Sequence, residues 1–185
     1  MRIIESPLPG VLVVEPRVFD DDRGCFYESY NEARFQEAGI RVNFVQTNVS
    51  RSSRGVLRGL HYQHPAPQGK LISVLAGEVY DVAVDIRHGS PTFGQWTAVM
   101  LTESNYRHLW VPEGFAHGFC VVSDTATLMY QCTTHYDASA DASLRWDDPA
   151  LAIDWPVRDP LLSPKDQRAP LLAEVPPGRL PGYVS

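Results

Sequence analysis

Short runs of β-branched and aromatic residues fill most of this chain, and Gly, Pro, Asn or Asp interrupts them every few residues. Such runs are too short for long buried helices and are typical of strands joined by turns in a sandwich or barrel. We therefore predict an all-β fold, with AGE at 76–78 as a tight turn between two strands. The expected strands are 11–15, 24–29, 43–49, 56–63, 70–75, 79–86, 97–101 and 127–136.

Helices are expected to be few, short and peripheral. One is predicted at 32–38, where Asn31 can cap the first turn, Glu32 favours the helix dipole and Gly39 can end the helix. The proline-rich segment 155–185 predicts a loop-rich C-terminal wrap with at most one helical turn. At 185 residues without an internal repeat, the chain is expected to form a single domain, 1–185.

Alternation along two expected strands assigns side chains to faces. Asp81 and Asp85 fall on one face of the strand 79–86, opposite Val82 and Val84. Along the strand that begins at 43, Gln46, Asn48 and Ser50 likewise share one face. Two interpretations stay open at this point. The polar face either lines a barrel interior that holds a polar ligand, or it faces water on a half-exposed sheet.

Charge and cysteine content exclude some classes of protein. The formal net charge is -6 and no basic stripe occurs, so nucleic acid is not an expected partner. The odd count of three cysteines, Cys25, Cys120 and Cys132, without a C-x-x-C spacing favours reduced, small buried residues over a disulfide framework. No signal peptide or membrane span is predicted, and the expected location is the cytoplasm.

The segment GLHYQHPAPQGK at 59–70 brings together His61 and Lys70, with Arg58 just before it. A neutral imidazole is a suitable base near pH 7, and an ammonium can stabilise an oxyanion. A base of this kind needs a carboxylate partner, and spacing does not choose among several candidates, which include Asp81, Asp85 and Asp166. By itself, a single strand histidine is more often structural than catalytic.

A second segment, VPEGFAHGF at 111–119, contains P-x-G-x-x-H and resembles the second half-motif of the cupin superfamily of double-stranded β-helix barrels. In cupins that histidine can be a metal ligand. The first half-motif would need H-x-H, but here His61 and His64 form H-x-x-H, which points two imidazoles to opposite faces of a strand. The spacing therefore disfavours a preformed metal site and favours acid–base chemistry.

Eight ordered blocks resemble the dTDP-4-dehydrorhamnose 3,5-epimerase family over nearly the whole chain. They are EPRVFDDDRGCFYESYN (15–31), FVQTNVS (44–50), VLRGLHYQ (56–63), QGKLISVLAGEVYDVAVDIRHGSPTFGQW (68–96), WVPEGFAHGF (110–119), MYQCTTHY (129–136), WDDPALAIDWP (146–156) and LSPKDQRAP (162–170).

The resemblance implies a cupin jelly roll that works without a metal or cofactor. It inverts C3 and C5 of dTDP-4-dehydro-6-deoxy-D-glucose, giving dTDP-4-dehydro-L-rhamnose for dTDP-L-rhamnose biosynthesis. It assigns His61 as the base, Asp166 as its carboxylate partner, Lys70 near the C4 oxygen and Tyr130 as the acid on the opposite sugar face. These roles fit a proton transfer beside a ketone, which needs a base, an acid and a cation at the enolate oxygen.

The same resemblance implies a homodimer with shared active sites. Phe19, Arg23 and Glu28 correspond to a segment that reaches the neighbouring subunit's dTDP-sugar, with the ring near thymine and the arginine near phosphate. Other positions that it places around the substrate are Gln46, Asn48, Arg58, His117, Tyr136 and Lys165.

Three positions depart from a simple transfer of the family pattern. Strict alternation separates Arg58 from His61, and we hypothesise a bulge at Gly59 that brings both inward. Asp141 stands where the family often has Glu, and Thr47 replaces a common Asp. The reaction class is unaffected, while the exact nucleotide sugar stays open.

Alternative functions therefore remain at this stage. One is a single-site 3- or 5-epimerase that acts on a related nucleotide sugar. The others, from different classes, are a metal-dependent cupin and a cupin that only binds sugars. Label exchange in D₂O distinguishes a single-site epimerase from an enzyme that inverts both carbons. Metal analysis identifies a metal-dependent cupin.

Overall fold

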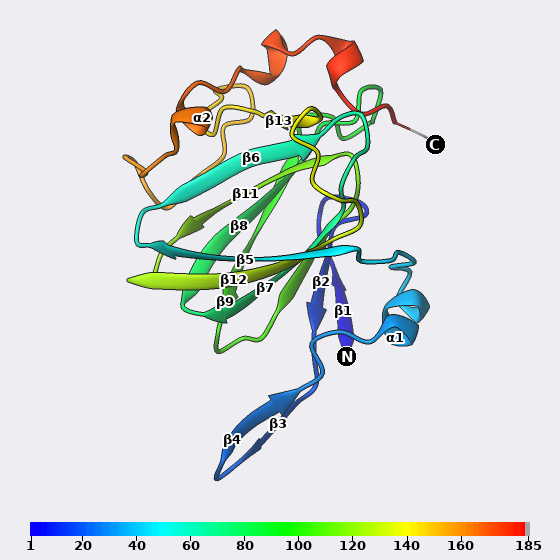
Figure 1. Cartoon of the computed structure of the whole chain (residues 1–185), viewed down its shortest axis with the longest axis vertical. Coiled ribbons are helices and arrows are strands. Elements are labelled where there is room, and N and C mark those ends of the chain that lie inside the picture. Colours follow the sequence, from blue (N-terminus) through cyan, green and yellow to red (C-terminus); the bar gives the residue numbers. More distant parts are fainter. Residues whose placement is uncertain (184–185) are drawn as a thin grey trace.

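The computed structural model describes residues 1–183 and consists mainly of two facing sheets, which confirms the all-β jelly-roll prediction (Figure 1). One sheet has six strands in the order β1-β2-β10-β7-β12-β5, and the other has five in the order β13-β6-β11-β8-β9. The strands of the first are β1 (Arg2–Glu5), β2 (Leu12–Glu15), β10 (His108–Val111), β7 (Lys70–Ala76), β12 (Thr125–Cys132) and β5 (Gln46–Ser53). Those of the second are β13 (Asp141–Ser143), β6 (Leu57–Gln63), β11 (Phe115–Val121), β8 (Glu78–Asp85) and β9 (Trp96–Thr102).

A separate hairpin of β3 (Val18–Asp21) and β4 (Gly24–Tyr27) extends away from both sheets, at the lower end of the view in Figure 1. Its aromatic residues Phe19 and Phe26 are 51% and 70% exposed. Large apolar side chains left in water at this level are typical of a surface that another molecule covers.

The predicted helix is α1 (Glu32–Glu37), and it ends one residue earlier than expected. The Asn31 side chain accepts a hydrogen bond from the Arg34 N–H, as the capping prediction requires. The C-terminal segment carries α2 (Pro164–Gln167) and the 3-10 turns η1 (Leu172–Glu174) and η2 (Pro177–Arg179). This segment runs along the five-stranded sheet, and the last two residues of the expected wrap lie outside the described part.

The alternation predicted for β8 is confirmed, with both of its faces buried. Val79 and Ala83 pack between the sheets, whereas Val82 and Val84 pack beneath the C-terminal segment with Trp155. On β5, Gln46 and Asn48 are partly buried while the alternate residues are exposed. Both polar side chains line a cavity, which favours the barrel-ligand interpretation over the half-exposed sheet.

The turn predicted at 76–78 joins β7 to β8, which lie in different sheets. Gly77 has φ +80°, and a β-carbon there would lie 2.0 Å from the Thr125 carbonyl oxygen. Glycine is therefore required both by the backbone conformation and by the close approach of the start of β12. The turn moves the chain from one sheet to the other instead of closing a hairpin.

Five strands were not expected from the sequence: β1, β3, β10, β11 and β13. Every residue of β11 is buried, so this strand shows no alternation of polar and apolar residues. In β3, the two aspartates at its end resemble a turn. The cysteine interpretation is confirmed for the buried Cys120 and Cys132 but wrong for Cys25, which is exposed on the projecting hairpin; all three are free thiols.

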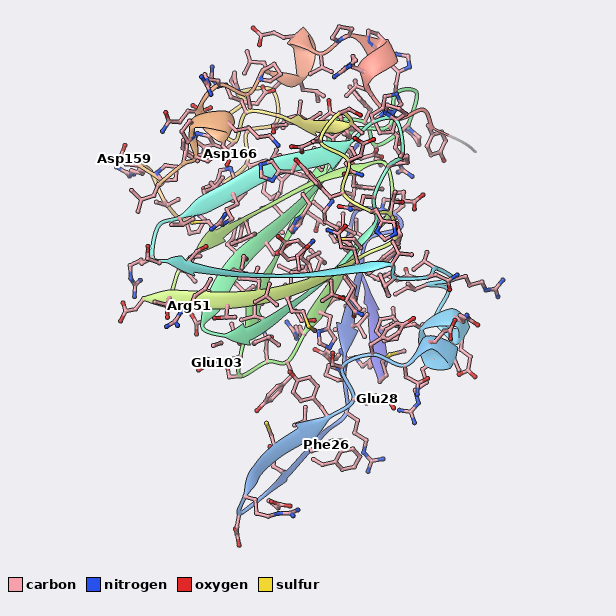
Figure 2. The ribbon with its side chains drawn as sticks, in the orientation of Figure 1. Phe26, Glu28, Arg51, Glu103, Asp159 and Asp166 are labelled. Carbon is pink, nitrogen blue, oxygen red and sulfur yellow. The ribbon has the colours of Figure 1, made fainter. Side chains whose placement is uncertain are left out.

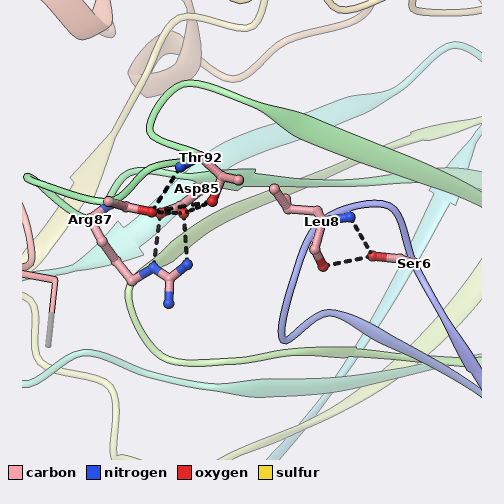
Figure 3. Close-up of polar contacts among 6 residues, drawn as sticks. Ser6, Leu8, Asp85, Arg87 and Thr92 are labelled. Carbon is pink, nitrogen blue, oxygen red and sulfur yellow. Dashed lines mark hydrogen bonds and ion pairs between the residues drawn. The ribbon is translucent and has the colours of Figure 1, made fainter. Parts of the chain in front are cut away.

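A buried acidic network fixes the loop after β8 (Figure 3). Arg87 donates to both carboxylate oxygens of Asp85 at 2.9 and 2.7 Å, and Ser90 and Thr92 donate to Oδ2 at 2.6 and 2.7 Å. Burial alone would raise the pKa of Asp85, but these donors outweigh it and hold that pKa at about 2. Figure 3 also shows Ser6 Oγ bridging the N–H and C=O of Leu8, whose side chain is buried in the core.

We expect Asp85→Asn to lower the free energy of unfolding by about 2 kcal/mol at pH 7, because the carboxylate pKa lies well below its value of 3.8 in the unfolded chain. The contribution of the carboxylate is present above about pH 4 and is lost as the pH falls towards 2. Urea unfolding of both proteins at several pH values measures this. Asp124→Asn, which removes an exposed partner of Arg54, is the control and should change nothing measurable. A constant difference from pH 7 to pH 2 would contradict the assignment.

Candidate active site

A cavity of about 400 Å³ opens between the two sheets. It is lined by Gln46, Asn48, His61, Tyr62, Gln63, Gln68, Lys70, Tyr130, Tyr136, Asp141 and Lys165. Eight of these eleven side chains carry an amide, ammonium, imidazole or carboxylate group, and the other three are tyrosines. The interior is therefore suited to a polar ligand with an aromatic component. Strands β6, β7, β12 and β5 therefore bring together residues that are far apart in the sequence.

His61 and Asp166 form a hydrogen-bonded pair across 105 residues. The His61 Nε2 to Asp166 Oδ1 distance is 2.6 Å, and the Asp166 side chain is 2% exposed whereas that of His61 is 35% exposed. Asp81 is bonded to a different histidine, so Asp166 is the carboxylate partner of His61. The geometry is that of an imidazole whose orientation and tautomer are set by a buried carboxylate.

Asp166 is fixed independently of His61 by the start of α2. Ser163 caps this helix, donating to Asp166 Oδ2 at 2.9 Å and accepting from its backbone N–H at 3.1 Å. Burial disfavours the ionised carboxylate, but the hydrogen bonds from His61 and Ser163 prevail and lower its pKa below the ordinary value. The pair therefore holds a carboxylate ready to stabilise a protonated imidazole.

A bulge in β6 brings Arg58 towards His61, as hypothesised. His61 is opposite His117 and Arg58 is opposite Phe119, so three residue steps on β6 correspond to two steps on β11. Gly59, with φ +123°, allows the close approach, because a β-carbon there would lie 2.5 Å from the Gly118 Cα. Arg58 and His61 both line a neighbouring cavity of about 320 Å³.

Lys70 lies at the start of β7 and is only 8% exposed. Its Nζ lies 3.5 Å from the Gln68 carbonyl oxygen, a long contact that leaves the ammonium free to bind another acceptor. Burial lowers the pKa of Lys70, and the neighbouring Cys132 and Asp141 oppose that shift. A desolvated cation of this kind stabilises negative charge far more strongly than one in water.

Tyr130 lies on β12, where it is opposite Asn48 on β5 and Ile72 on β7. Burial raises the pKa of the phenol, and the nearby Arg58 partly offsets the shift. The group therefore remains a protonated acid at neutral pH. Because Tyr130 and Lys70 belong to the six-stranded sheet and His61 to the five-stranded sheet, an acid and a base enter the cavity from its two walls.

The rim of the cavity carries Tyr136 and Lys165, two of the residues predicted to bind substrate. The backbone N–H of Tyr136 donates to Gln46 Oε1 at 2.8 Å, which ties the rim loop to β5. Gln63 binds the same loop, because its Oε1 accepts from the Asp137 N–H at 2.9 Å. Sequence reasoning missed Gln63 and Gln68 as cavity residues; their only sequence signal is that they flank the predicted base and cation.

Six predicted site residues do not line this cavity. Two of them, Arg58 and Asp166, line the neighbouring cavity together with His61, and the other four lie elsewhere. Phe19, Arg23 and Glu28 belong to the projecting hairpin and the chain after it, and Figure 2 shows Glu28 in the lower half of the view, away from Asp166 in the upper half. Arg23 is paired with Asp21 at 2.6 Å. His117 is buried, with Nε2 2.8 Å from Asp81 Oδ1, and it does not line the cavity. Their substrate contacts stay predictions.

Within residues 1–183, no group of three or more His, Cys, Asp or Glu side chains is arranged to hold a metal ion. In the same part of the chain, no helix has the length and apolarity that crossing a membrane requires.

Comparison with known proteins identifies relatives of the chain. A sequence model of the dTDP-4-dehydrorhamnose 3,5-epimerase family matches residues 5–174. The dTDP-4-dehydrorhamnose 3,5-epimerase of Shigella flexneri is 54% identical over 168 residues, which are 90% of this chain and 93% of that protein.

Solved structures agree with this relationship. The dTDP-6-deoxy-D-glucose-3,5-epimerase of Legionella pneumophila, in complex with dTDP-4-keto-L-rhamnose, is 52% identical and has a TM-score of 0.97, covering 100% of this chain and 99% of that chain. A 3'-monoepimerase from Streptomyces bikiniensis, in complex with dTDP-quinovose, is 36% identical with a TM-score of 0.90, covering 97% and 93%. The chain belongs to the dTDP-4-dehydrorhamnose 3,5-epimerase family.

Proposed function

We propose that this chain is an isomerase that inverts C3 and C5 of dTDP-4-dehydro-6-deoxy-D-glucose, giving dTDP-4-dehydro-L-rhamnose in dTDP-L-rhamnose biosynthesis. The observation that carries the proposal is one cavity with a carboxylate-paired histidine on one sheet and a buried lysine and a phenol on the other. Membership of the family supports the substrate and the reaction.

His61 acts as the general base. Because Nε2 donates to Asp166, the Nδ1 lone pair is the basic position that takes the proton from the carbon next to the ketone. The imidazolium that forms is stabilised by the buried carboxylate. A well-placed base of this kind contributes on the order of 10²–10⁴-fold to the rate.

Lys70 binds the C4 oxygen, where negative charge develops as the proton leaves. The ketone acidifies both adjacent carbons, so the same enolate chemistry serves both C3 and C5. Asp166 and Lys165 come from α2 within the C-terminal segment, and we therefore propose that 1–185 works as a single catalytic domain.

Tyr130→Phe should lower net inversion by about 10²-fold while deuterium exchange beside the ketone continues, because proton removal does not need the acid on the opposite face. Proton NMR of the keto sugar in D₂O measures both rates. Tyr80→Phe is the matched control, since Tyr80 packs on the outside of the barrel with Trp155. An equal fall in exchange and inversion would show that Tyr130 binds the substrate instead of protonating it.

We propose a homodimer in which the β3–β4 hairpin completes the partner subunit's site. Its exposed Phe19 suits a thymine ring and Arg23 suits a phosphate, yet neither lies at the cavity of its own chain. Gln46, Asn48, Arg58, His117, Tyr136 and Lys165 are proposed to contact the remainder of the dTDP-sugar. Light scattering should give twice the chain mass of 20.7 kDa, and an active monomer would contradict the shared site.

The reaction is proposed to need no metal or cofactor, because the chain supplies base, acid and oxyanion cation itself. Dialysis against a chelator should leave the rate unchanged. Activity that is lost on dialysis and restored by added metal would overturn the acid–base mechanism.

The three free thiols suit the reducing cytoplasm, where we place the protein. Cell fractionation tests this location.

A second candidate is a single-site epimerase, which the likeness to the Streptomyces bikiniensis 3'-monoepimerase favours. The proposed function is tested by adding the purified protein to dTDP-4-dehydro-6-deoxy-D-glucose and identifying the product by NMR. The doubly inverted sugar is expected. A product inverted at one carbon would favour the second candidate, and bound nucleotide without any conversion would make the chain a binding protein.

A further inference from the structure

Two side chains at the rim of the cavity share one hydrogen-bond acceptor, Asp141 Oδ2. The Tyr136 hydroxyl donates to it at 3.1 Å, and the Lys165 Nζ lies 2.5 Å from the same oxygen. The three residues come from the loop after β12, from β13 and from α2. One carboxylate therefore joins three separate segments at the entrance of the cavity.

The three side chains differ in how firmly the fold holds them. Tyr136 is 56% exposed and the Lys165 side chain is 46% exposed, whereas the Asp141 side chain is 19% exposed. Asp141 also sits in β13, directly opposite Gln63 on the strand that carries His61. A fixed carboxylate thus restrains two side chains that would otherwise sample several rotamers.

The contact also changes the charge at the rim. Lys165 neutralises Asp141, so the carboxylate does not present an uncompensated negative charge to an anionic ligand. The catalytic pair is held separately, because Asp166 is bonded to Ser163 and His61. Asp141 is therefore placed to influence ligand binding without altering the geometry of the base.

We infer that Asp141 is a positioning residue for the nucleotide diphosphate: it preorganises the Tyr136 ring and the Lys165 ammonium at the mouth before the ligand enters. This inference rests on the proposed function, in which those two residues contact the substrate. Restraining them in advance lowers the entropy lost on binding. The role needs no direct contact between Asp141 and the reacting carbons.

The test is isothermal titration with dTDP together with steady-state kinetics on the keto sugar. Asp141→Ala should raise both the dTDP Kd and the KM about tenfold, since it removes a hydrogen bond and an ion pair. Because Asp141 also helps to keep Lys70 protonated, kcat is compared on the acidic side of the alkaline limb, where it should stay within about twofold. Asp141→Asn keeps an acceptor for Tyr136 and should give a smaller rise. The thermal midpoint of each variant checks that the fold is retained.

A double-mutant cycle separates positioning from a general effect. With Tyr136→Phe as the second change, the combined rise in Kd should be smaller than the product of the two single effects, because both remove the same contact. Asp147→Asn is the matched control: it breaks an exposed aspartate–arginine pair with Arg145 outside the cavity and should leave Kd unchanged.

The positioning role would be overturned if Asp141→Ala left the dTDP Kd unchanged or lowered kcat in parallel. It would also be overturned if the rise in Kd of the double variant equalled the product of the two single rises. The dTDP titration does not depend on turnover. If the wild-type protein binds dTDP but fails to convert the keto sugar, the proposed function fails while the role of Asp141 is still tested by its Kd.

Discussion

His61→Ala should lower kcat by about 10³-fold and abolish deuterium exchange beside the ketone, while dTDP still binds. A large effect is expected because His61 is the proposed base, and because its removal leaves Asp166 as a buried carboxylate without its imidazole partner. Binding of dTDP is expected to persist because the residues proposed to contact the nucleotide, such as Tyr136 and Lys165, are unchanged. NMR exchange rates and dTDP titration together separate chemistry from binding.

The matched control for this change is His88→Ala. His88 is exposed in the loop after β8 and outside the cavity, and only its backbone is paired with the C-terminal segment. This variant should keep wild-type exchange and turnover. If His61→Ala retained exchange at a comparable rate, His61 would not be the base and the proposed mechanism would be wrong.

Lys70→Met should lower kcat by about 10²–10³-fold, the effect expected when a cation at a developing oxyanion is lost from a site that excludes water. Methionine has a similar volume and carries no charge, so the packing around β7 is preserved. Because the lysine is buried at a cost in desolvation, the variant should be no less stable than wild type. Thermal unfolding measured beside kcat separates lost catalysis from lost structure.

Arg51→Met is the control for Lys70→Met, since Arg51 is an exposed cation on β5 (Figure 2) and does not line the cavity. It should leave kcat unchanged.

The burial that lowers the pKa of Lys70 also implies that its cation is lost at a lower pH than for a free lysine. Wild-type activity should fall on the alkaline side as the ammonium deprotonates, and this limb should be absent from the residual activity of Lys70→Met.

Local sequence signals were sufficient for much of the fold. Alternation located β8 and the inward polar side chains of β5, and the capping residue Asn31 located α1. These signals did not predict strands that lack polar and apolar alternation or that are very short. Strand β11 is buried on both faces and has no polar alternation, and β13 has only three residues. Propensity rules do not detect either case.

The site depended on information that spacing does not contain. His61 and Asp166 are 105 residues apart and meet only because the C-terminal segment places α2 beside β6. From the residues alone, Asp81 was an equal candidate, but it is bonded to His117 instead. The resemblance to the family supplied the correct partner. It did not indicate the contact of Asp141 with Tyr136 and Lys165, which depends on side-chain geometry.

The central claim is that one cavity removes and returns protons at two carbons beside the same ketone. Incubating the wild-type protein with dTDP-4-dehydro-6-deoxy-D-glucose in D₂O and locating deuterium in the product by NMR tests this claim most directly. We predict label at both C3 and C5, together with inversion at both centres. Label at only one of these carbons, or at neither, would contradict it.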